Sequence, residues 1–421
     1  MARPFVPYME HTDPMSKNAP PAGHRPETLA IRAGLARSPN GETSEALYLN
    51  SGFVFDSAEQ ADAAFRGEID RYLYARYANP TISMLEERLR VLEGAEMCRA
   101  TASGMAAVFA AMACYLESGD RVVAGATLFG SSLHILTKIL PKWGVAVDLV
   151  PPADLNAWEA ALAKPAKIVF VETPTNPTLD IVDLAALTGL AHRAGAKVIV
   201  DNVVGTPVLQ LPLEFGCDVV VYSTTKHLDG QGRTLGGAVL CDKAFDKDFL
   251  QPFTRHTGPA ISPFNAWVVV KGLETLSLRV REMSRTAQTL AERLEALPNV
   301  TRVAYPGLAS HPSHAVAKRQ MKDGLFGSVL SVEVEGGRPA AFAFLNALEI
   351  VDLSNNLGDA KSLSCHPSTT THRVLEPEAR EAAGITEGLV RISVGLEHVD
   401  DLWRDLQGAA LAAADAVRKA A

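Results

Sequence analysis

The sequence has 421 residues, of which 47% are hydrophobic and 21% are charged. This length exceeds that of one ordinary core, so we expect two domains and an appendage, and the composition is that of a soluble globular protein. The net charge of -8 argues against a nucleic-acid partner, whose phosphates call for a basic protein face. No apolar run approaches the roughly 20 residues of a membrane span.

The amino-terminal residues carry prolines and charges where a secretory signal would have its apolar core, so we expect no export. The five cysteines are an odd number and form no C-x-x-C pair, which favours buried thiols in a reducing compartment over disulfides or a zinc site. His311 and His314 have no nearby third ligand, so we expect no metal site. A cytoplasmic location follows as the expectation.

Residues 1 to about 26 contain six prolines and little periodic apolar pattern, so we expect a flexible or extended arm there. From residue 28 to 81 the sequence gains aromatic side chains but still lacks a clear period. A segment of this kind packs more readily on another surface than around a core of its own. We therefore expect residues 1–75 to form an arm that contacts a neighbouring subunit.

A regular alternation of elements begins after residue 93. Short apolar runs typical of strands occupy 121–124, 145–150, 167–172, 197–201, 218–222 and 236–241. Helical patterns end near residue 116 and cover 131–140, 155–163 and 184–194. This alternation predicts right-handed βαβ units and a mostly parallel sheet covered on both faces, which is an α/β fold. We assign residues 76–270 to this domain.

Near Pro263 the pattern changes to that of a long helix. Its apolar side chains recur at steps of three and four as far as Leu297, and Pro298 ends the stripe. Shorter segments follow, with strands near 329–334 and 389–394 and helices at 339–348, 377–383 and 399–417. They predict a smaller α+β domain over residues 271–421.

Lys226 lies in the most informative stretch of the α/β domain. The apolar run at 218–222 predicts a strand buried on both faces, and Lys226 comes just past its carboxyl end, ahead of a glycine-rich turn. Ligands of open α/β sheets bind outside the carboxyl ends of the strands, so this lysine is a functional candidate. Taken alone, however, Lys226 is better explained as a surface residue, because most lysines are exposed.

Two other features could act together with this lysine. Ser103 and Gly104 lie between a strand and a helix start, where backbone N–H groups favour a phosphate, although a serine N-cap alone explains them better. Asp201 ends an apolar strand and can face the same crevice as Lys226, with an ordinary salt bridge as the strong alternative. An imine-forming lysine, a carboxylate for a pyridine nitrogen and a helix terminus for a phosphate are what a pyridoxal phosphate (PLP) site needs.

Four motifs together carry a family resemblance. They are Glu172-Thr-Pro-Thr-Asn-Pro-Thr, Val200-Asp-Asn, Tyr222-Ser-Thr-Thr-Lys-His and Val390-Arg-Ile-Ser-Val-Gly-Leu-Glu. In this order they resemble the Cys/Met-metabolism family of PLP-dependent enzymes, over a stretch from about residue 27 to about residue 406. The resemblance implies the aspartate-aminotransferase fold (fold type I), with a large, mostly parallel-sheet domain and a smaller C-terminal α+β domain. It also implies PLP as the cofactor.

The resemblance implies a role for each matching residue. Lys226 would be the Schiff-base lysine, Asp201 the partner of the pyridinium nitrogen, and Asn176 a neighbour of the ring hydroxyl. The residues that would hold the phosphate are Ser103, Gly104, Met105, Ser223 and Thr225.

Three further residues owe their expected roles to their positions in the family's motifs. Tyr74 and Arg76 match a Tyr-x-Arg pair that reaches the phosphate of the neighbouring subunit, and in an extended chain their spacing of two places both side chains on one side. Arg391 would bind the substrate α-carboxylate as a guanidinium fork. Without the family, a surface aromatic with a basic neighbour and a structural salt bridge would explain these residues.

Three positions depart from common family patterns. Phe129 stands where many relatives have a tyrosine that stacks on the ring, so stacking survives but the phenolic proton carrier is lost. Ser131 stands where methionine γ-lyases typically have cysteine, and Asn356 where many relatives have serine near the lysine and the substrate carboxylate. Within the family these features most resemble the O-succinylhomoserine sulfhydrylases.

The resemblance implies a γ-replacement in methionine biosynthesis, in which O-succinylhomoserine and hydrogen sulfide give homocysteine and succinate. It also implies a homotetramer built from dimers with shared active sites. The alternatives are a cystathionine γ-synthase, an O-acetylhomoserine sulfhydrylase and a methionine or cystathionine γ-lyase. A non-catalytic α/β protein that binds a phosphate ligand is a more remote alternative.

Overall fold

A computed structural model gives the structure of the protein and describes residues 23–373 and 375–420. The described chain forms two compact units. Unit 1 takes in the residues up to Tyr115 together with Val221–Thr225 and Arg233–Thr275, and unit 2 takes in Leu116–Val220, Lys226–Gly232 and the chain from Leu276 onward. The arm expected over residues 1–26 lies almost entirely outside the described residues.

Seven strands form a mixed sheet in the order β1-β7-β6-β5-β4-β2-β3. Their bounds are β1 Met97–Thr101, β2 Arg121–Gly125, β3 Ala146–Val150, β4 Ile168–Glu172, β5 Lys197–Asp201, β6 Val219–Ser223 and β7 Gly237–Cys241. Strands β2 to β5 pair in parallel, as the alternation with helices predicts, whereas β1 and β7 pair antiparallel. The predicted mostly parallel α/β fold is confirmed.

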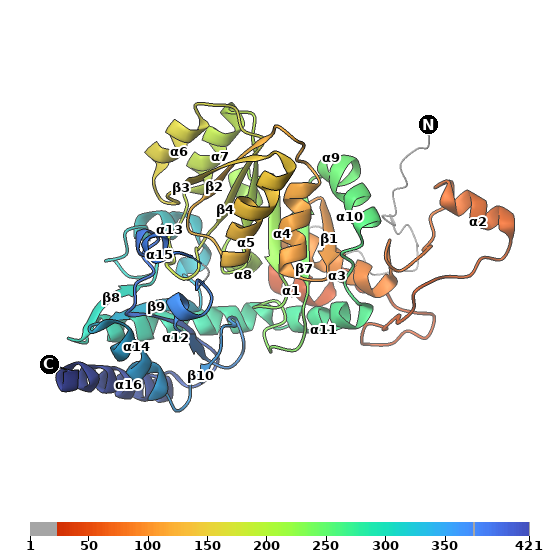
Figure 1. The fold of residues 1–421 in the computed structure, drawn as a ribbon. Helices are drawn as coiled ribbons and strands as arrows, with labels where there is room; N and C mark the ends of the chain where they lie inside the picture. The colour runs from red at the N-terminus through yellow and green to blue at the C-terminus, as the bar shows by residue number, and fades with distance from the viewer. Residues whose placement is uncertain (1–22, 374, 421) are drawn as a thin grey trace. The chain divides into compact units, whose positions relative to one another are not determined.

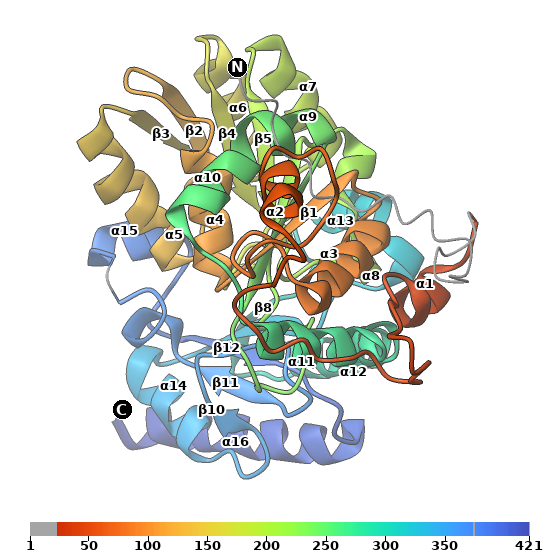
Figure 2. The same ribbon diagram turned by 90° about the vertical axis from the view of Figure 1, so that its right-hand side faces the viewer.

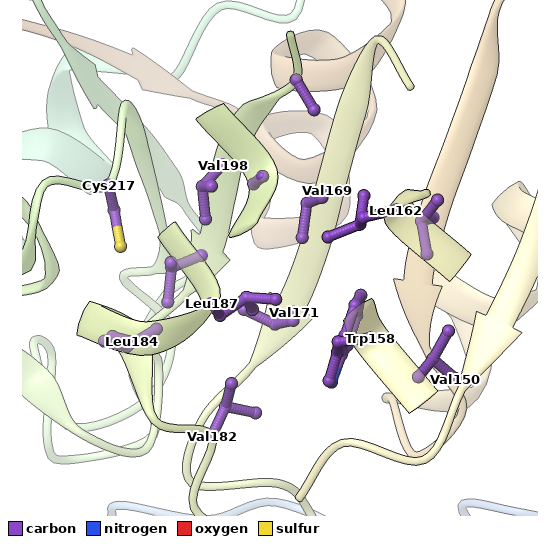
Figure 3. Packing of buried hydrophobic residues seen from close by; sticks show 14 of the residues in the cluster. Val150, Trp158, Leu162, Val169, Val171, Val182, Leu184, Leu187, Val198 and Cys217 are labelled. Carbon is purple, nitrogen blue, oxygen red and sulfur yellow. The ribbon is translucent and has the colours of Figure 1, made fainter. Parts of the chain in front are cut away.

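Two helices of unit 2, α6 (Leu155–Leu162) and α7 (Leu184–Arg193), pack on one face of β4 (Figure 1). Side chains alternate along a strand, so Val169 and Val171 share a face and meet Trp158 of α6 and Leu187 of α7 (Figure 3). These side chains are fully buried. Burying each one stabilises the fold by about 1.5–3 kcal/mol, and the resulting core fixes where β4 and β5 end.

The helices of unit 1 include α3, which begins where Asn79 Oδ1 accepts the backbone N–H groups of Thr81 and Ile82, and which ends at the left-handed Gly94. Figure 1 shows α2 within an excursion of the chain away from β1 of the same unit. The helix bounds in this unit are α1 Pro26–Arg32, α2 Ala58–Phe65, α3 Pro80–Glu93, α4 Gly104–Ala113, α9 Lys243–Phe245, α10 Gln251–Thr257 and α11 Pro263–Leu273.

The carboxyl-terminal part of unit 2 holds a second sheet in the order β10-β11-β12-β9-β8. Helix α14 packs on β9 and β12, and α16 lies beside α14 (Figure 2). The strand bounds are β8 Val300–Ala304, β9 Val329–Val334, β10 Asp352–Leu353, β11 Leu363–Cys365 and β12 Leu389–Ser393. The remaining helices of this unit are α5 Gly130–His134, α8 Thr206–Leu209, α12 Leu276–Glu295, α13 His314–Gln320, α14 Gly337–Asn346, α15 Pro377–Ala382 and α16 Val399–Ala420.

The prediction of one long helix from Pro263 to Leu297 is wrong in its continuity. The chain forms α11 and then α12, with Glu274 and Thr275 between them. Thr275 N donates to Gly272 O at 3.3 Å, a bond to the third residue back in place of the fourth, and this tightens the turn. The apolar stripe continues across the interruption, so the sequence pattern does not reveal it.

None of the described helices combines the length and apolar character that crossing a membrane requires. The five cysteines are free thiols, and all but Cys114 are buried.

Candidate active site

Polar residues stand at the carboxyl ends of three strands. β4 ends at Glu172, β5 ends at Asp201, and Lys226 follows the end of β6 at Ser223 by three residues. Glu172 and Asp201 lie opposite each other in the parallel register of β4 and β5. The predicted positions of Asp201 at a strand end and of Lys226 just beyond one are confirmed.

Lys226 is half-buried, in contrast to the exposed lysine of the simpler interpretation. Its Nζ donates to Asn356 Oδ1 at 2.6 Å, so the amine has a fixed position. Burial, followed by the positive charge of Arg391, lowers the pKa of Lys226 to about 8. The neutral, nucleophilic amine is therefore far more abundant near neutral pH than in an ordinary lysine.

Arg391 lies on β12 and is 1% exposed. Its Nη1 donates to Asn176 Oδ1 at 3.2 Å, and its Nη2 donates to the backbone oxygens of Asn356 at 2.7 Å and Asn355 at 3.1 Å. Nε has no partner among the described residues. These acceptors carry no charge, so among the described residues Arg391 does not form the structural salt bridge considered from sequence, and the guanidinium retains its positive charge for an anionic ligand.

Glu172 joins this network and was missed as a site residue by sequence reasoning. Its Oε1 accepts the backbone N–H of Asn176 at 2.8 Å, and its Oε2 accepts that of Phe129 at 2.9 Å. Burial and the charge of Asp201 raise the pKa of Glu172, and burial also raises that of Asp201. The available signal was the pattern that singled out Asp201, a carboxylate that ends a fully apolar strand.

Unit 2 therefore brings several predicted residues together with Glu172 in a single linked set. Hydrogen bonds run from Lys226 through Asn356 and Arg391 to Asn176, and Glu172 continues the chain to Phe129. Asp201 belongs to the set through its strand neighbour Glu172. An amine, a guanidinium and paired carboxylates in one network can bind an anionic amino acid and transfer protons.

In unit 1, Ser103, Gly104 and Met105 form the start of α4. Ser103 is the N-cap, and its Oγ accepts the backbone N–H of Ala106 at 3.1 Å, so the predicted cap is confirmed. A Cβ added to Gly104 would lie 2.5 Å from Ser223 Cβ and 2.8 Å from its Oγ. The lack of a side chain at Gly104 thus lets Ser223 pack closely against the start of α4, so that the Ser103 and Ser223 hydroxyls lie by a helix N-terminus, where a phosphate can bind.

Thr225 lies beside the same strand end. Its Oγ1 donates to the backbone oxygen of Gly236 at 3.3 Å and accepts the backbone N–H of that residue at 3.2 Å. The neighbouring Thr224 is buried, and its Oγ1 has no partner among the described residues. The Thr225 hydroxyl is therefore bonded to the Gly236 backbone, whereas the Thr224 hydroxyl, next to Ser223 in the sequence, has no partner among the described residues.

We predict that Gly104→Ala lowers the free energy of unfolding by about 1–3 kcal/mol, because the added methyl group would overlap the backbone and side chain of Ser223. Thermal or urea unfolding of the apoprotein measures the change. Gly408→Ala is the matched control, since Gly408 lies in α16 with open space around it. That variant should gain up to about 1 kcal/mol from helix propensity. Equal stability of Gly104→Ala and wild type would show that the close contact is not real.

Tyr74 and Arg76 do not lie on an extended run, so that part of the sequence prediction is wrong. Tyr77 N donates to Tyr74 O at 2.8 Å, which makes a turn. The two side chains nevertheless meet, with the guanidinium of Arg76 5.4 Å from the ring centre of Tyr74. Arg76 also donates to the backbone oxygen of Arg255 and lies 4.8 Å from the ring centre of Tyr77. Its contacts within the described residues thus do not include the Ser103 group.

The histidine pair lies at the start of α13. His314 Nδ1 bonds to Pro306 O at 2.8 Å, and His311 Nδ1 accepts the backbone N–H of Ser313 at 3.1 Å. Over residues 23–373 and 375–420, His, Cys, Asp and Glu side chains form no group of three or more that could hold a metal ion.

Comparison with known proteins identifies relatives that match most of the chain. Residues 27–411 match the family model of the Cys/Met metabolism PLP-dependent enzymes. The O-succinylhomoserine sulfhydrylase of Mycobacterium tuberculosis is 51% identical over 94% of this chain and 99% of its own length, and that of Pseudomonas aeruginosa is 47% identical over 90% and 94%. The crystal structure of cystathionine gamma synthase from Xanthomonas oryzae pv. oryzae superposes with a TM-score of 0.89 at 36% identity, covering 93% of this chain and 99% of that chain.

Proposed function

Because the chain belongs to the Cys/Met metabolism PLP-dependent enzymes, we propose that it catalyses a γ-replacement in methionine biosynthesis. The substrates are O-succinylhomoserine and hydrogen sulfide, and the products are homocysteine and succinate. The C–O bond at the γ-carbon breaks as succinate leaves, and sulfur forms a new bond to the same carbon. The observation that carries the proposal is the 51% identity, over 94% of the chain, to a sulfhydrylase of that name.

Lys226 is the amine that binds the cofactor. Bound PLP supplies an electron sink for negative charge that develops on the substrate carbon atoms. Lys226 then removes the α-proton of the amino acid and returns protons to the other carbons. Its lowered pKa and its hydrogen bond to Asn356 suit an amine that must be both neutral and oriented. Phe129 has no hydroxyl, so it cannot share this proton transfer.

Three residues orient the cofactor ring in this proposal. Asp201 keeps a proton on the ring nitrogen through its negative charge. Its carboxylate accepts a hydrogen bond from Val203 N at 3.1 Å, and this backbone donor does not neutralise the charge. Asn176 lies near the ring hydroxyl, and Phe129 stacks on the ring. Both are anchored by their backbone N–H groups to Glu172.

The charged ends of the ligands meet positive and hydroxyl groups. Arg391 binds the α-carboxylate of the substrate, and its unpartnered Nε supports that role because a buried donor gains from an anionic acceptor. Asn356 lies between this guanidinium and the lysine, beside the substrate. The phosphate of the cofactor is held by Ser103, Gly104, Met105, Ser223 and Thr225.

A partner subunit completes the site in a homotetramer built from dimers. Tyr74, at the end of the arm (residues 1–75), and Arg76, just beyond it, reach the phosphate of the partner's cofactor. Large apolar side chains of this segment face solvent in the single chain: Val54 is 85% exposed, Leu49 69% and Phe65 58%. Their burial against another subunit would stabilise the assembly. Sedimentation of the purified protein measures the subunit number.

The reaction is tested by assaying O-succinylhomoserine and O-acetylhomoserine, each with sulfide or with cysteine. We expect homocysteine from the succinyl ester and sulfide, with kcat/KM at least about tenfold above the other three combinations. Reactions without a thiol are the control and should release no keto acid. Preference for cysteine would identify a cystathionine γ-synthase instead, and keto-acid release without a thiol would identify a lyase.

A further inference from the structure

Glu172 holds two loops of unit 2 at once. It is the last residue of β4 and is 3% exposed. One carboxyl oxygen accepts from Phe129 N, in the loop after β2, and the other from Asn176 N, in the loop after β4. Both oxygens are thus used on backbone groups, and the two residues so held belong to the linked set around Lys226.

The neighbouring Asp201 determines the charge of Glu172. The two residues are register partners on adjacent strands, so their carboxyl groups compete for one negative charge. Burial and the charge of Asp201 raise the pKa of Glu172. A protonated Glu172 can still accept both N–H groups while leaving the negative charge on Asp201.

A carboxylate that accepts backbone N–H groups need not have any role beyond stability. Asp405 of α16 is an example in the same unit: it is 9% exposed and accepts from Glu349, Ile350 and Val351 at 2.8–3.0 Å. Within the described residues, these three hydrogen bonds of Asp405 involve no residue of the Lys226 network. It therefore provides a matched comparison for a purely structural carboxylate.

We propose that Glu172 is a positioning residue of the cofactor site, which fixes Phe129 and Asn176 around the ring and leaves the negative charge on Asp201. The inference rests on the proposed function, since these residues surround a ring only if Lys226 binds the cofactor. Its consequence is that Glu172 determines both the affinity for PLP and the orientation of the bound ring.

The variant Glu172→Gln tests the inference. Glutamine has the shape of glutamate, but its NH2 group must face one of the two backbone N–H groups, so one bond is lost. Titrating apoprotein with PLP should show a Kd roughly tenfold higher than that of wild type, because a lost bond of this kind is worth about one factor of ten. The visible circular dichroism of the bound cofactor should also weaken, because the ring is no longer held at one angle.

Asp405→Asn is the control, and it should lower the melting temperature without changing the PLP affinity or the visible dichroism. If Glu172→Gln has the wild-type PLP affinity and visible dichroism, the inference is overturned while the proposed function stands. The same conclusion follows if Asp405→Asn changes these two quantities as much as Glu172→Gln does. If Glu172→Gln does not fold, Glu172→Asp keeps the carboxyl group but is one methylene shorter and cannot span both N–H groups, so it should show the same two changes. A wild type without the visible absorbance of a lysine-bound cofactor would overturn the proposed function and this inference with it.

Discussion

Lys226→Ala should lose the visible absorbance of the lysine-bound cofactor, and kcat for homocysteine formation should fall more than about a thousandfold. The variant lacks both the amine that binds the cofactor and the group that moves protons, and general acid–base catalysis alone contributes about 10²–10⁴-fold. Removing the amine also frees Asn356 Oδ1, its hydrogen-bond partner at 2.6 Å. Absorbance spectra of the purified protein and a coupled homocysteine assay measure the two effects.

Lys322→Ala is the matched control for this prediction. Lys322 lies in the same unit and pairs at 3.0 Å with Glu214, where both side chains are exposed. Exposed ion pairs contribute about 0–1 kcal/mol, so the control should fold, bind PLP and turn over as the wild type does. Normal turnover by Lys226→Ala would refute the assignment of this lysine.

Asp201→Asn should lower kcat by about 10²–10³-fold while the protein remains folded. An amide cannot hold a negative charge beside the ring nitrogen, so the ring would lose its proton and much of its capacity to accept electrons.

Because burial raises the pKa of Asp201 above its unfolded value, its ionised form costs folding free energy as the pH rises through the folded pKa. The apoprotein of the variant should therefore unfold at the same or a higher temperature near neutral pH.

Asp218→Asn is the control that separates the fall in kcat of Asp201→Asn from the effect of removing any partly buried carboxylate of the same unit. Asp218 lies just before β6, accepts Val198 N at 2.8 Å and pairs with Lys197 and His192. That variant should lose stability, since it breaks these bonds, but should keep the wild-type kcat. A kcat of Asp201→Asn within a few-fold of wild type would mean that Asp201 does not control the ring nitrogen.

The sequence predicts β2 to β7, β9 and β12 and their ends well, because most of these strands are continuous apolar runs, but it does not predict β1, β8, β10 and β11. The run that ends at Asp201 and the run before Lys226 have clear polar boundaries, and the structure places both strand ends there. The direction of pairing is not visible in such a run, which is why the antiparallel β1 and β7 require the structure.

The contacts of the site could not be predicted from the sequence. Asn356 lies 130 residues from Lys226, and Phe129 lies 43 residues from Glu172. Glu172 binds backbone groups, and no side-chain motif marks such a partner. The turn at Tyr74 was not predicted either, because it depends on a hydrogen bond from Tyr77 N to Tyr74 O that residue spacing alone does not reveal.

The most direct measurement of the central claim is a peptide map of the holoenzyme after borohydride reduction. Reduction fixes the cofactor to the lysine that binds it, and mass spectrometry then identifies the modified peptide. We predict that the pyridoxyl group is found on Lys226, which is half-buried and has a lowered pKa. A pyridoxyl group on any other lysine, with Lys226 unmodified, would contradict the account.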